Sequence, residues 1–167
     1  MVQRIMIIGC CGSGKSTLSK KIQERTKLPL IHLDKEYFGP DWEKPAKDEW
    51  KRKVINLCKN DKWIIDGNYI SSMHIRITRA DLVVFIDISR FKCLLRAVLR
   101  ASRKTEKHRS DMADGCNERH DFEFYKFIWN FNKTTKPLII QLVKQFENVE
   151  LVVIKNNKDI ESLLNRF

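Results

Sequence analysis

The hydrophobic pattern of this 167-residue chain alternates between two periods. Short apolar runs have the length and the β-branched content of buried parallel strands, and they lie at residues 4–8, 30–33, 63–65, 82–86 and 149–154. Between these runs, apolar residues recur every three or four positions, as on one face of a helix. Such stretches cover residues 16–26, 46–60 and 90–103, and others lie at 121–131, after Pro137 and after Asn157. Alternating strands and helices predict a five-stranded parallel sheet in a single α/β domain over residues 1–167.

Two helical stretches have an unusual composition. In residues 90–103 the apolar positions form a stripe that is expected to face the core: Phe91, Leu94, Leu95, Val98 and Leu99. Residues 121–131 hold six aromatic side chains, which predicts a helix buried on most of its faces. A stacking platform for single-stranded nucleic acid is the alternative interpretation of so many rings. Pro137 is expected to open the next helix, because proline fits the first helical turn.

The most informative segment of the chain is Gly-Cys-Cys-Gly-Ser-Gly-Lys-Ser at residues 9–16. It has the G-x-x-x-x-G-K-[ST] spacing of the Walker A phosphate-binding loop, or P-loop. Gly9 and Gly14 let the backbone turn so that consecutive N–H groups point at phosphate oxygens. Lys15 places an ammonium against the β- and γ-phosphates, and the Ser16 hydroxyl is placed to ligate Mg²⁺. The expected nucleotide-binding residues are Gly9, Cys10, Cys11, Gly12, Ser13, Gly14, Lys15, Ser16 and Thr17.

Three aspartates stand at the ends of predicted strands. Asp34 follows the second strand, where the ligand crevice of an open α/β sheet lies, so it is expected to meet a phosphoryl acceptor. A helix cap or a turn is the alternative role for Asp34. Asp66 ends the run Trp-Ile-Ile-Asp, a Walker B-like strand whose carboxylate can hold water on Mg²⁺. Asp87 ends the fourth strand and competes for that role, but Asp66 is favoured.

Further residues are expected to complete the two halves of the site. The acceptor is expected to bind near residues 34–60, with Trp42, Asn68 and Tyr69 in contact and Arg76 on an acceptor anion. A core position for the tryptophan and a solvated surface position for the arginine are the alternatives. The turn at Asn156 is expected to lie beside the nucleotide base.

A basic segment without periodicity, residues 103–118, follows the fourth strand and its helix. It is interpreted as a lid that keeps water away from the transferring phosphoryl group. Arg109 and Arg119 are expected to neutralise charge that develops in the transition state. Pairing of these arginines with Asp111 or Asp121, which would only rigidify the lid, is the alternative.

Composition restricts the function classes only in part. The net charge of +11 and a stripe at Arg96, Arg100 and Arg103 predict affinity for polyanions, whether nucleic acid, acidic membrane or nucleotide phosphates. The five cysteines show no zinc-ligand spacing and are expected to be free thiols. No apolar stretch reaches the length of about 20 residues that a membrane helix needs, and a signal-peptide pattern is missing. A cytoplasmic protein without a membrane partner is expected.

The order of these segments resembles the adenylate kinase-like branch of P-loop kinases. It resembles more closely the bacterial proteins catalogued as DNA topology modulation proteins, which are predicted kinases of that branch. The matching segments are residues 9–17, 32–34, 63–69, 109–116 with 118–119, and 121–131. The resemblance implies a three-layer P-loop NTPase fold with strand order 2-3-1-4-5. It also implies ATP as phosphoryl donor, Mg²⁺ as its metal and a small molecule as acceptor.

The same resemblance bears on the acceptor. Nucleotide kinases usually continue the Asp-Gly motif after the third strand as Gly-Phe-Pro-Arg, whereas this chain has Gly67-Asn68-Tyr69 after Asp66. This departure argues against a nucleoside monophosphate. Asp34 resembles the aspartate that contacts the acceptor hydroxyl in shikimate- and gluconate-type kinases, which implies an alcohol. The sequence therefore predicts an ATP-dependent small-molecule kinase. A nucleic-acid-associated regulatory ATPase and a nucleotide-binding protein without catalysis are the alternatives.

Overall fold

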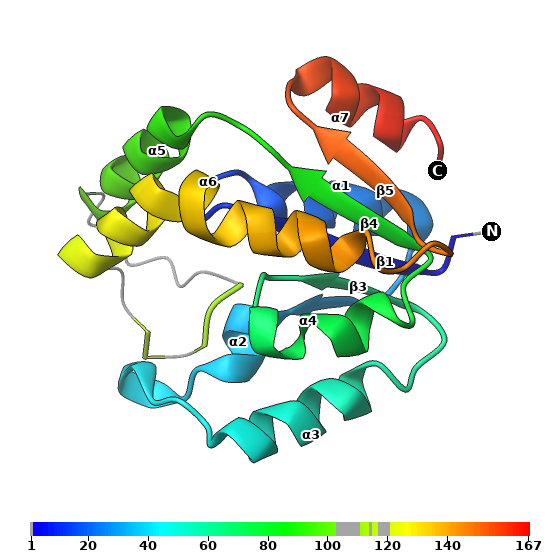
Figure 1. Ribbon diagram of the computed structural model, residues 1–167, viewed down its shortest axis with the longest axis horizontal. Coiled ribbons are helices and arrows are strands. Elements are labelled where there is room, and N and C mark those ends of the chain that lie inside the picture. The colour runs from blue at the N-terminus through cyan, green and yellow to red at the C-terminus, as the bar shows by residue number, and fades with distance from the viewer. Residues whose placement is uncertain (1, 103–110, 114, 117–120) are drawn as a thin grey trace.

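A central parallel sheet organises the computed structural model, which describes residues 2–102, 111–113, 115–116 and 121–167 (Figure 1). Its strands pair in the order β2-β3-β1-β4-β5, and every pairing is parallel. The predicted five-stranded α/β fold and its strand order are confirmed. The strands are β1 (Arg4–Gly9), β2 (Leu30–His32), β3 (Trp63–Asp66), β4 (Leu82–Ile86) and β5 (Glu150–Ile154).

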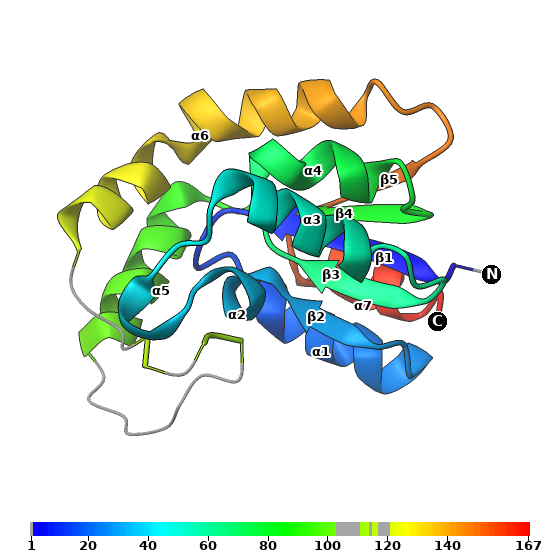
Figure 2. The same ribbon diagram turned by 90° about the horizontal axis from the view of Figure 1, so that it is seen from below.

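Helices cover both faces of the sheet and make three layers (Figure 2). One face packs against α1 (Lys15–Thr26) and α7 (Asn157–Leu164), with Leu18, Ile22 and Leu163 in the core. The other face packs against α3 (Lys47–Leu57), α4 (Ile70–Ile77), α5 (Arg90–Ser102) and α6 (Phe122–Val143). The short elements α2 (Leu33–Tyr37) and η1 (Pro40–Trp42) follow β2.

The strand register brings three separate segments to one edge of the sheet. Ile7 of β1 lies beside Asp66 of β3, and His32 of β2 lies beside the same aspartate. Gly9, which ends β1, lies beside Ile86 at the end of β4. Because the carboxyl ends of parallel strands share an edge, the P-loop and the three predicted strand-end aspartates, Asp34, Asp66 and Asp87, lie toward it.

Helix α4 was not predicted, because residues 70–77 lie outside the helical stretches expected from the sequence. The segment forms two helical turns, and Met73 and Ile77 are fully buried against the sheet. Helix α6 is a second correction. It runs through Pro137 without a break, although proline was expected to open a new helix. The proline removes an N–H donor, but Pro137 and Lys133, whose carbonyl loses that partner, are both exposed to water.

The apolar stripe predicted for α5 does not face the core. Phe91, Leu95 and Leu99 are 61%, 59% and 49% exposed, whereas the small residues Cys93 and Ala97 are buried. The reason is a close approach between α5 and the P-loop: a Cβ atom added at Gly12 would lie 2.4 Å from the Cys93 carbonyl oxygen. Only a face of small side chains permits such proximity. In α6, similarly, Ile128 and Phe131 are buried but Phe122 is 76% exposed, so the prediction of a helix buried on most faces was wrong.

Two further findings concern the cysteines and the length of the helices. All five cysteines are free thiols, as expected. In the part of the chain that the structure describes, every helix is too short or too polar to cross a bilayer.

Candidate active site

The P-loop connects β1 to α1 and adopts the expected conformation. Gly9 and Gly14 have φ values of 148° and 100°, a region that residues with a side chain rarely enter. The loop closes over its own lysine, since Lys15 Nζ donates to the carbonyl oxygens of Gly9 and Cys10 at 3.1 and 3.0 Å. The Cys10 side chain points into the core, where a hydrogen bond with Cys93 and burial raise the pKa of its thiol.

A cavity of about 1040 Å³ opens beside this loop at the carboxyl ends of the strands. Its volume is at the upper end of the range for small-molecule sites, which leaves room for a nucleotide and a second small ligand. The lining comes from both faces of the sheet and from segments far apart in sequence: residues 11–18, Lys20, Lys21, Asp34, Phe38, Trp42, Asp66, Tyr69, Arg96, Arg100, Asp111, Met112, Asp121, Phe124, Asn157 and Ile160.

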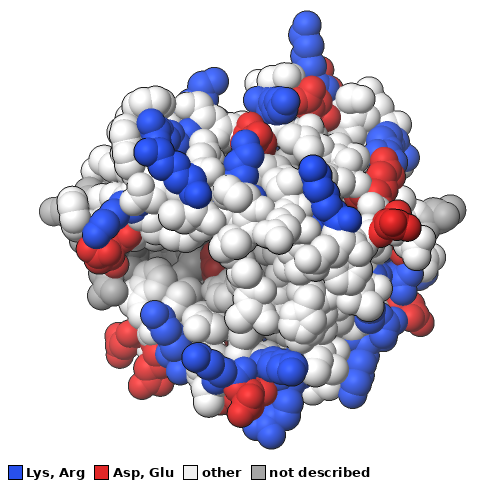
Figure 3. All heavy atoms as spheres, in the orientation of Figure 1, with Lys and Arg blue, Asp and Glu red and all other residues white. Residues whose placement is uncertain are grey.

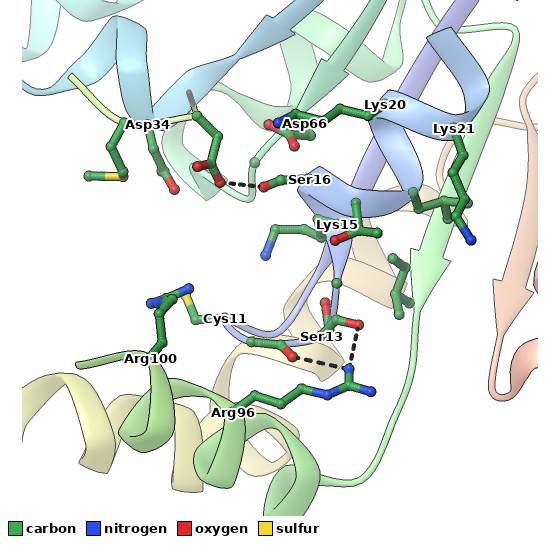
Figure 4. A pocket seen from close by; sticks show the side chains of 18 of the residues that line it. Cys11, Ser13, Lys15, Ser16, Lys20, Lys21, Asp34, Asp66, Arg96 and Arg100 are labelled. Atoms are coloured by element: carbon green, nitrogen blue, oxygen red, sulfur yellow. Dashed lines mark hydrogen bonds between the residues drawn. The ribbon is translucent and has the colours of Figure 1, made fainter. Parts of the chain in front are cut away.

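One part of the cavity lining is basic. Figure 4 shows Lys15 at its floor, with Arg96 and Arg100 of α5 on one side of the P-loop. The Arg96 guanidinium donates to the carbonyl oxygens of Gly12 and Ser13, each at 3.4 Å, and so holds α5 against the loop. These contacts place Arg96 of the predicted basic stripe beside the loop that was expected to hold phosphates, and Arg100 lines the same cavity.

Asp66, at the end of β3, lines the cavity. It is 5% exposed, accepts from the Ser19 hydroxyl at 3.1 Å, and lies 2.9 Å from Nδ1 of His32. Its rival Asp87 is engaged elsewhere, because Lys136 of α6 donates to both of its carboxylate oxygens at 2.8 and 2.7 Å. Of the two, Asp66 lines the cavity and Asp87 does not, and the metal role of Asp66 stays a prediction. The contacts of Asp66 with Ser19 and His32 were not anticipated.

The donor set of Ser16 and Asp66 suits Mg²⁺. Both are hard oxygen ligands, and Mg²⁺ is usually held by one or two carboxylates together with waters and substrate phosphates. The described residues contain no group of three or more acidic, histidine or cysteine side chains able to hold a metal ion without such phosphates. The residues present thus fit a metal that arrives with a nucleotide.

Another part of the cavity combines the Asp34 carboxylate, paired with the Tyr69 phenol, with aromatic rings. Asp34 lies in the first turn of α2, and its Oδ1 accepts from the Tyr69 hydroxyl at 2.7 Å. Burial, with the Asp34 charge and hydrogen bond adding to it, raises the pKa of Tyr69, so the phenol stays a donor at neutral pH. Tyr69 has φ 36°, a left-handed conformation that is rare for a bulky residue. Trp42 and Phe38 also line the cavity, and their rings pack edge to face with the ring centroids 5.0 Å apart.

Three predicted site residues act elsewhere. Arg76 was expected to bind an acceptor anion, but it is fully buried and donates to the carbonyl oxygens of Gly67, Asn68 and Tyr69. Burial lowers the pKa of Arg76 to about 10. Its guanidinium therefore fixes the turn after β3, and the prediction for Arg76 was wrong.

Asn68 and Asn156 are likewise occupied by backbone. The Asn68 amide exchanges two hydrogen bonds with Gly9, at 3.0 and 2.9 Å, and thus anchors the start of the P-loop instead of lining the cavity. Asn156 caps α7 by accepting from the N–H groups of Lys158 and Asp159, while its neighbour Asn157 lines the cavity. Arg109 and Arg119 lie outside the described residues.

Asp111 is a cavity residue that the sequence analysis did not assign to the site. Its Oδ2 accepts from the Ser16 hydroxyl at 2.6 Å, across 95 positions of sequence. The residues after it, Met112, Ala113 and Cys116, form a small buried cluster with Phe38 and Trp42. Sequence alone gave no signal for this contact, because it joins two segments that are adjacent only in the fold.

Comparison with known proteins supports the fold. No family model and no curated protein matches the sequence. Among solved structures, the chain is similar to shikimate kinase from Acinetobacter baumannii in complex with shikimate (TM-score 0.64, 14% identity, covering 99% of this chain and 90% of that one). It is also similar to shikimate kinase from Bacteroides thetaiotaomicron (0.61, 18%, 99% and 96%) and to an unliganded sugar kinase from Janibacter sp. HTCC2649 (0.52, 16%, 99% and 92%). The chain has an adenylate kinase-like P-loop fold.

Proposed function

We propose that this protein is an ATP-dependent kinase that transfers a phosphoryl group to a hydroxyl of a small molecule. The observation that carries this proposal is the set of side chains that line one cavity. The P-loop with Lys15 and Ser16 lines it, and so does the Asp34–Tyr69 pair. Similarity to shikimate and sugar kinases supports a kinase at the level of the fold.

The donor half would hold MgATP by charge and by backbone N–H groups. Lys15 leaves the carbonyl oxygens of Gly9 and Cys10 and turns to the β- and γ-phosphates, where Arg96 and Arg100 add positive charge. Ser16 and Asp66 would hold the Mg²⁺, which neutralises charge on the transferring group. Asn157 and Ile160 of α7 line the cavity and are placed to contact the base.

The acceptor half would orient a hydroxyl for in-line attack. The Tyr69 phenol orients Asp34, and the Asp34 carboxylate would accept the proton of the acceptor hydroxyl as the hydroxyl oxygen bonds to phosphorus and the bond to ADP breaks. Trp42 and Phe38 supply flat apolar walls that exclude water. An alcohol is favoured over a nucleoside monophosphate because Arg76, the expected anion contact, is buried away from the cavity.

Two sequence predictions remain proposals of the same kind. Arg109 and Arg119 would stabilise the charge that develops during transfer. The sequence resemblance to DNA topology modulation proteins, noted in residues 9–17, 63–69 and 109–116 among others, remains a prediction that the proteins are related. It does not indicate which molecule accepts the phosphoryl group.

The test separates binding from transfer. Wild type, Lys15→Ala and Asp34→Asn are titrated with MgATP by calorimetry and then supplied with [γ-³²P]ATP and a panel of nucleosides, neutral sugars, hydroxy acids and nucleotides. Loss of Lys15 removes the main phosphate contact and should abolish binding. Asp34→Asn should keep ATP affinity within about twofold but lower transfer by about 100-fold, the low end of what a positioned base contributes. Equal ATP binding by wild type and Lys15→Ala would overturn the proposal.

A further inference from the structure

The Ser16 hydroxyl touches a carboxylate that belongs neither to the P-loop nor to β3. Ser16 Oγ donates to Asp111 Oδ2 at 2.6 Å, and both residues line the cavity. Ser16 is the loop residue that the Walker A motif assigns to the metal. Asp111 therefore places a hard anionic oxygen directly beside the proposed Mg²⁺ ligand.

We propose that Asp111 is a third protein group of the metal site, and that its carboxylate binds the Mg²⁺ of MgATP alongside the Ser16 hydroxyl. This inference rests on the proposed function, because the metal enters with the nucleotide. It gives the site a carboxylate from the segment after α5 in addition to Asp66 of β3. Nothing in the P-loop motif itself calls for such a group.

The spacing of the two oxygens supports this assignment. Octahedral Mg²⁺ binds oxygen at about 2.0–2.1 Å, so neighbouring ligands stand about 2.9 Å apart. Ser16 Oγ and Asp111 Oδ2 are already at 2.6 Å, and a separation of a few tenths of an ångström brings them to that value. The serine needs only to turn its proton away, which frees a lone pair of the same oxygen.

The position of Asp111 is fixed from the acceptor side. The next residues, Met112 and Ala113, pack with Cys116 against Phe38 and Trp42. The Cys116 thiol also donates to the Gly39 carbonyl oxygen at 3.3 Å. The segment that carries the Asp111 carboxylate thus packs against Phe38 and Trp42, the two aromatic residues proposed to contact the acceptor. This packing connects the acceptor region to the metal site.

If Asp111 is not a metal ligand, its removal should strengthen ATP binding instead of weakening it. If Asp111 only occupied the place of a phosphate, its charge would repel nucleotide with or without metal. Its removal would then tighten the binding of ATP under both conditions by the same factor. A metal ligand, in contrast, contributes only when the metal is present.

The experiment measures ATP affinity by calorimetry in excess Mg²⁺ and again in EDTA, for wild type, Asp111→Asn and Asp121→Asn. Asp121 lines the same cavity and caps α6 through the N–H of Phe124, a role that asparagine also fills. Both substitutions remove one charge and keep the side-chain size. We expect Asp111→Asn to lower the affinity gain due to Mg²⁺ by about 10- to 100-fold, and Asp121→Asn to leave that gain within about twofold.

The Asp111→Cys variant tests the metal contact independently of Asp111→Asn, through the metal preference of ATP binding. A thiolate prefers soft metals to Mg²⁺. In Asp111→Cys, the increase in ATP affinity caused by Mg²⁺ should therefore be smaller than in wild type, and Cd²⁺ should restore it. Wild type should show no such preference for Cd²⁺, and its Cys11 is the internal control for thiols in the cavity. Circular dichroism at 222 nm checks that each variant is folded.

Each outcome decides between the two claims. Wild-type ATP binding that ignores Mg²⁺ would overturn both the metal site and this inference. Metal-dependent binding that is unchanged in Asp111→Asn, or tightened equally in Mg²⁺ and EDTA, would overturn the role of Asp111 and leave the proposed kinase intact.

Discussion

At the residue scale, the candidate site depends on side chains that orient other side chains. Asp66 is held between Ser19 and His32, and Asp34 is held by Tyr69. A carboxylate that must bind a metal or accept a proton needs a fixed side-chain orientation, and hydrogen bonds from neighbouring side chains provide that orientation. The left-handed backbone of Tyr69 is strain of the kind that persists at functional sites, where neighbouring contacts enforce it.

Tyr69→Phe tests the orientation of Asp34. The variant keeps the ring between Tyr37 and Trp50 but loses the 2.7 Å hydrogen bond. A hydrogen bond to a charged group contributes about 1.5–3 kcal/mol, so phosphoryl transfer should slow by about tenfold or more. ATP affinity should not change. Tyr37→Phe, in the same aromatic cluster, is the control, and equal kcat values for the two variants would contradict an orienting role for Tyr69.

At the scale of elements, small residues and buried polar contacts decided which faces of the helices meet the sheet. Helix α5 turns Cys93 and Ala97 inward because the P-loop approaches within contact distance of its backbone. Its larger side chains, Phe91 and Leu95, are left exposed. The amphipathic pattern therefore located the helix correctly but assigned the wrong face to the core.

A second contact between elements lies at the edge of the sheet opposite the site. The Asp81 carboxylate before β4 accepts from the backbone N–H groups of Gln3 and Arg4 at 2.9 Å each, and from the Arg4 guanidinium at 2.6 Å. Burial alone would raise the pKa of Asp81, but these hydrogen bonds outweigh it and lower the pKa below its ordinary value. The carboxylate thus fastens β1 to β4.

The lowered pKa fixes the sign of a stability prediction. A carboxyl group whose pKa is lower in the folded state stabilises the fold above its unfolded pKa, about 3.9, and this contribution disappears as the pH falls through the lowered value. Asp81→Asn should reduce the free energy of unfolding in urea by about 1 kcal/mol at pH 7, and by less at pH 3. Glu150→Gln breaks the more exposed pair with Arg166 and should cost less. A loss in Asp81→Asn that is equal at both pH values would refute this account.

At the scale of the whole molecule, the chain carries a net charge of +11. Figure 3 shows Lys and Arg around the periphery of one face, interspersed with Asp and Glu, and a largely uncharged centre. The described cations that line the cavity come from the P-loop with α1 and from α5: Lys15, Lys20, Lys21, Arg96 and Arg100. Neither the fold comparisons nor this distribution points to nucleic acid as a partner.

The charge nevertheless predicts a measurable behaviour. Association with DNA through scattered charges releases counterions and weakens steeply with salt. Any binding of duplex or single-stranded DNA at about 50 mM salt should be lost at about 200 mM, as followed by fluorescence anisotropy of a labelled 30-mer. MgATP should not alter it. Binding that survives 200 mM salt and prefers one sequence would favour the regulatory ATPase over the kinase.

The sequence by itself determined the features that depend on neighbouring residues. Hydrophobic periodicity located the five strands, and the spacing of Gly9, Gly14 and Lys15 defined a phosphate-binding loop, because loop conformation and strand burial are local properties. Asp66 could be favoured for the same reason, since it ends a buried strand.

Tertiary structure decided which side chains meet. It turned Asp87 toward Lys136, buried Arg76 under the turn that it supports, and used Asn68 to anchor Gly9. It also brought Asp111 to Ser16 from 95 positions away. These outcomes depend on helix rotation and on long-range packing, which the order of residues constrains only through the complete fold.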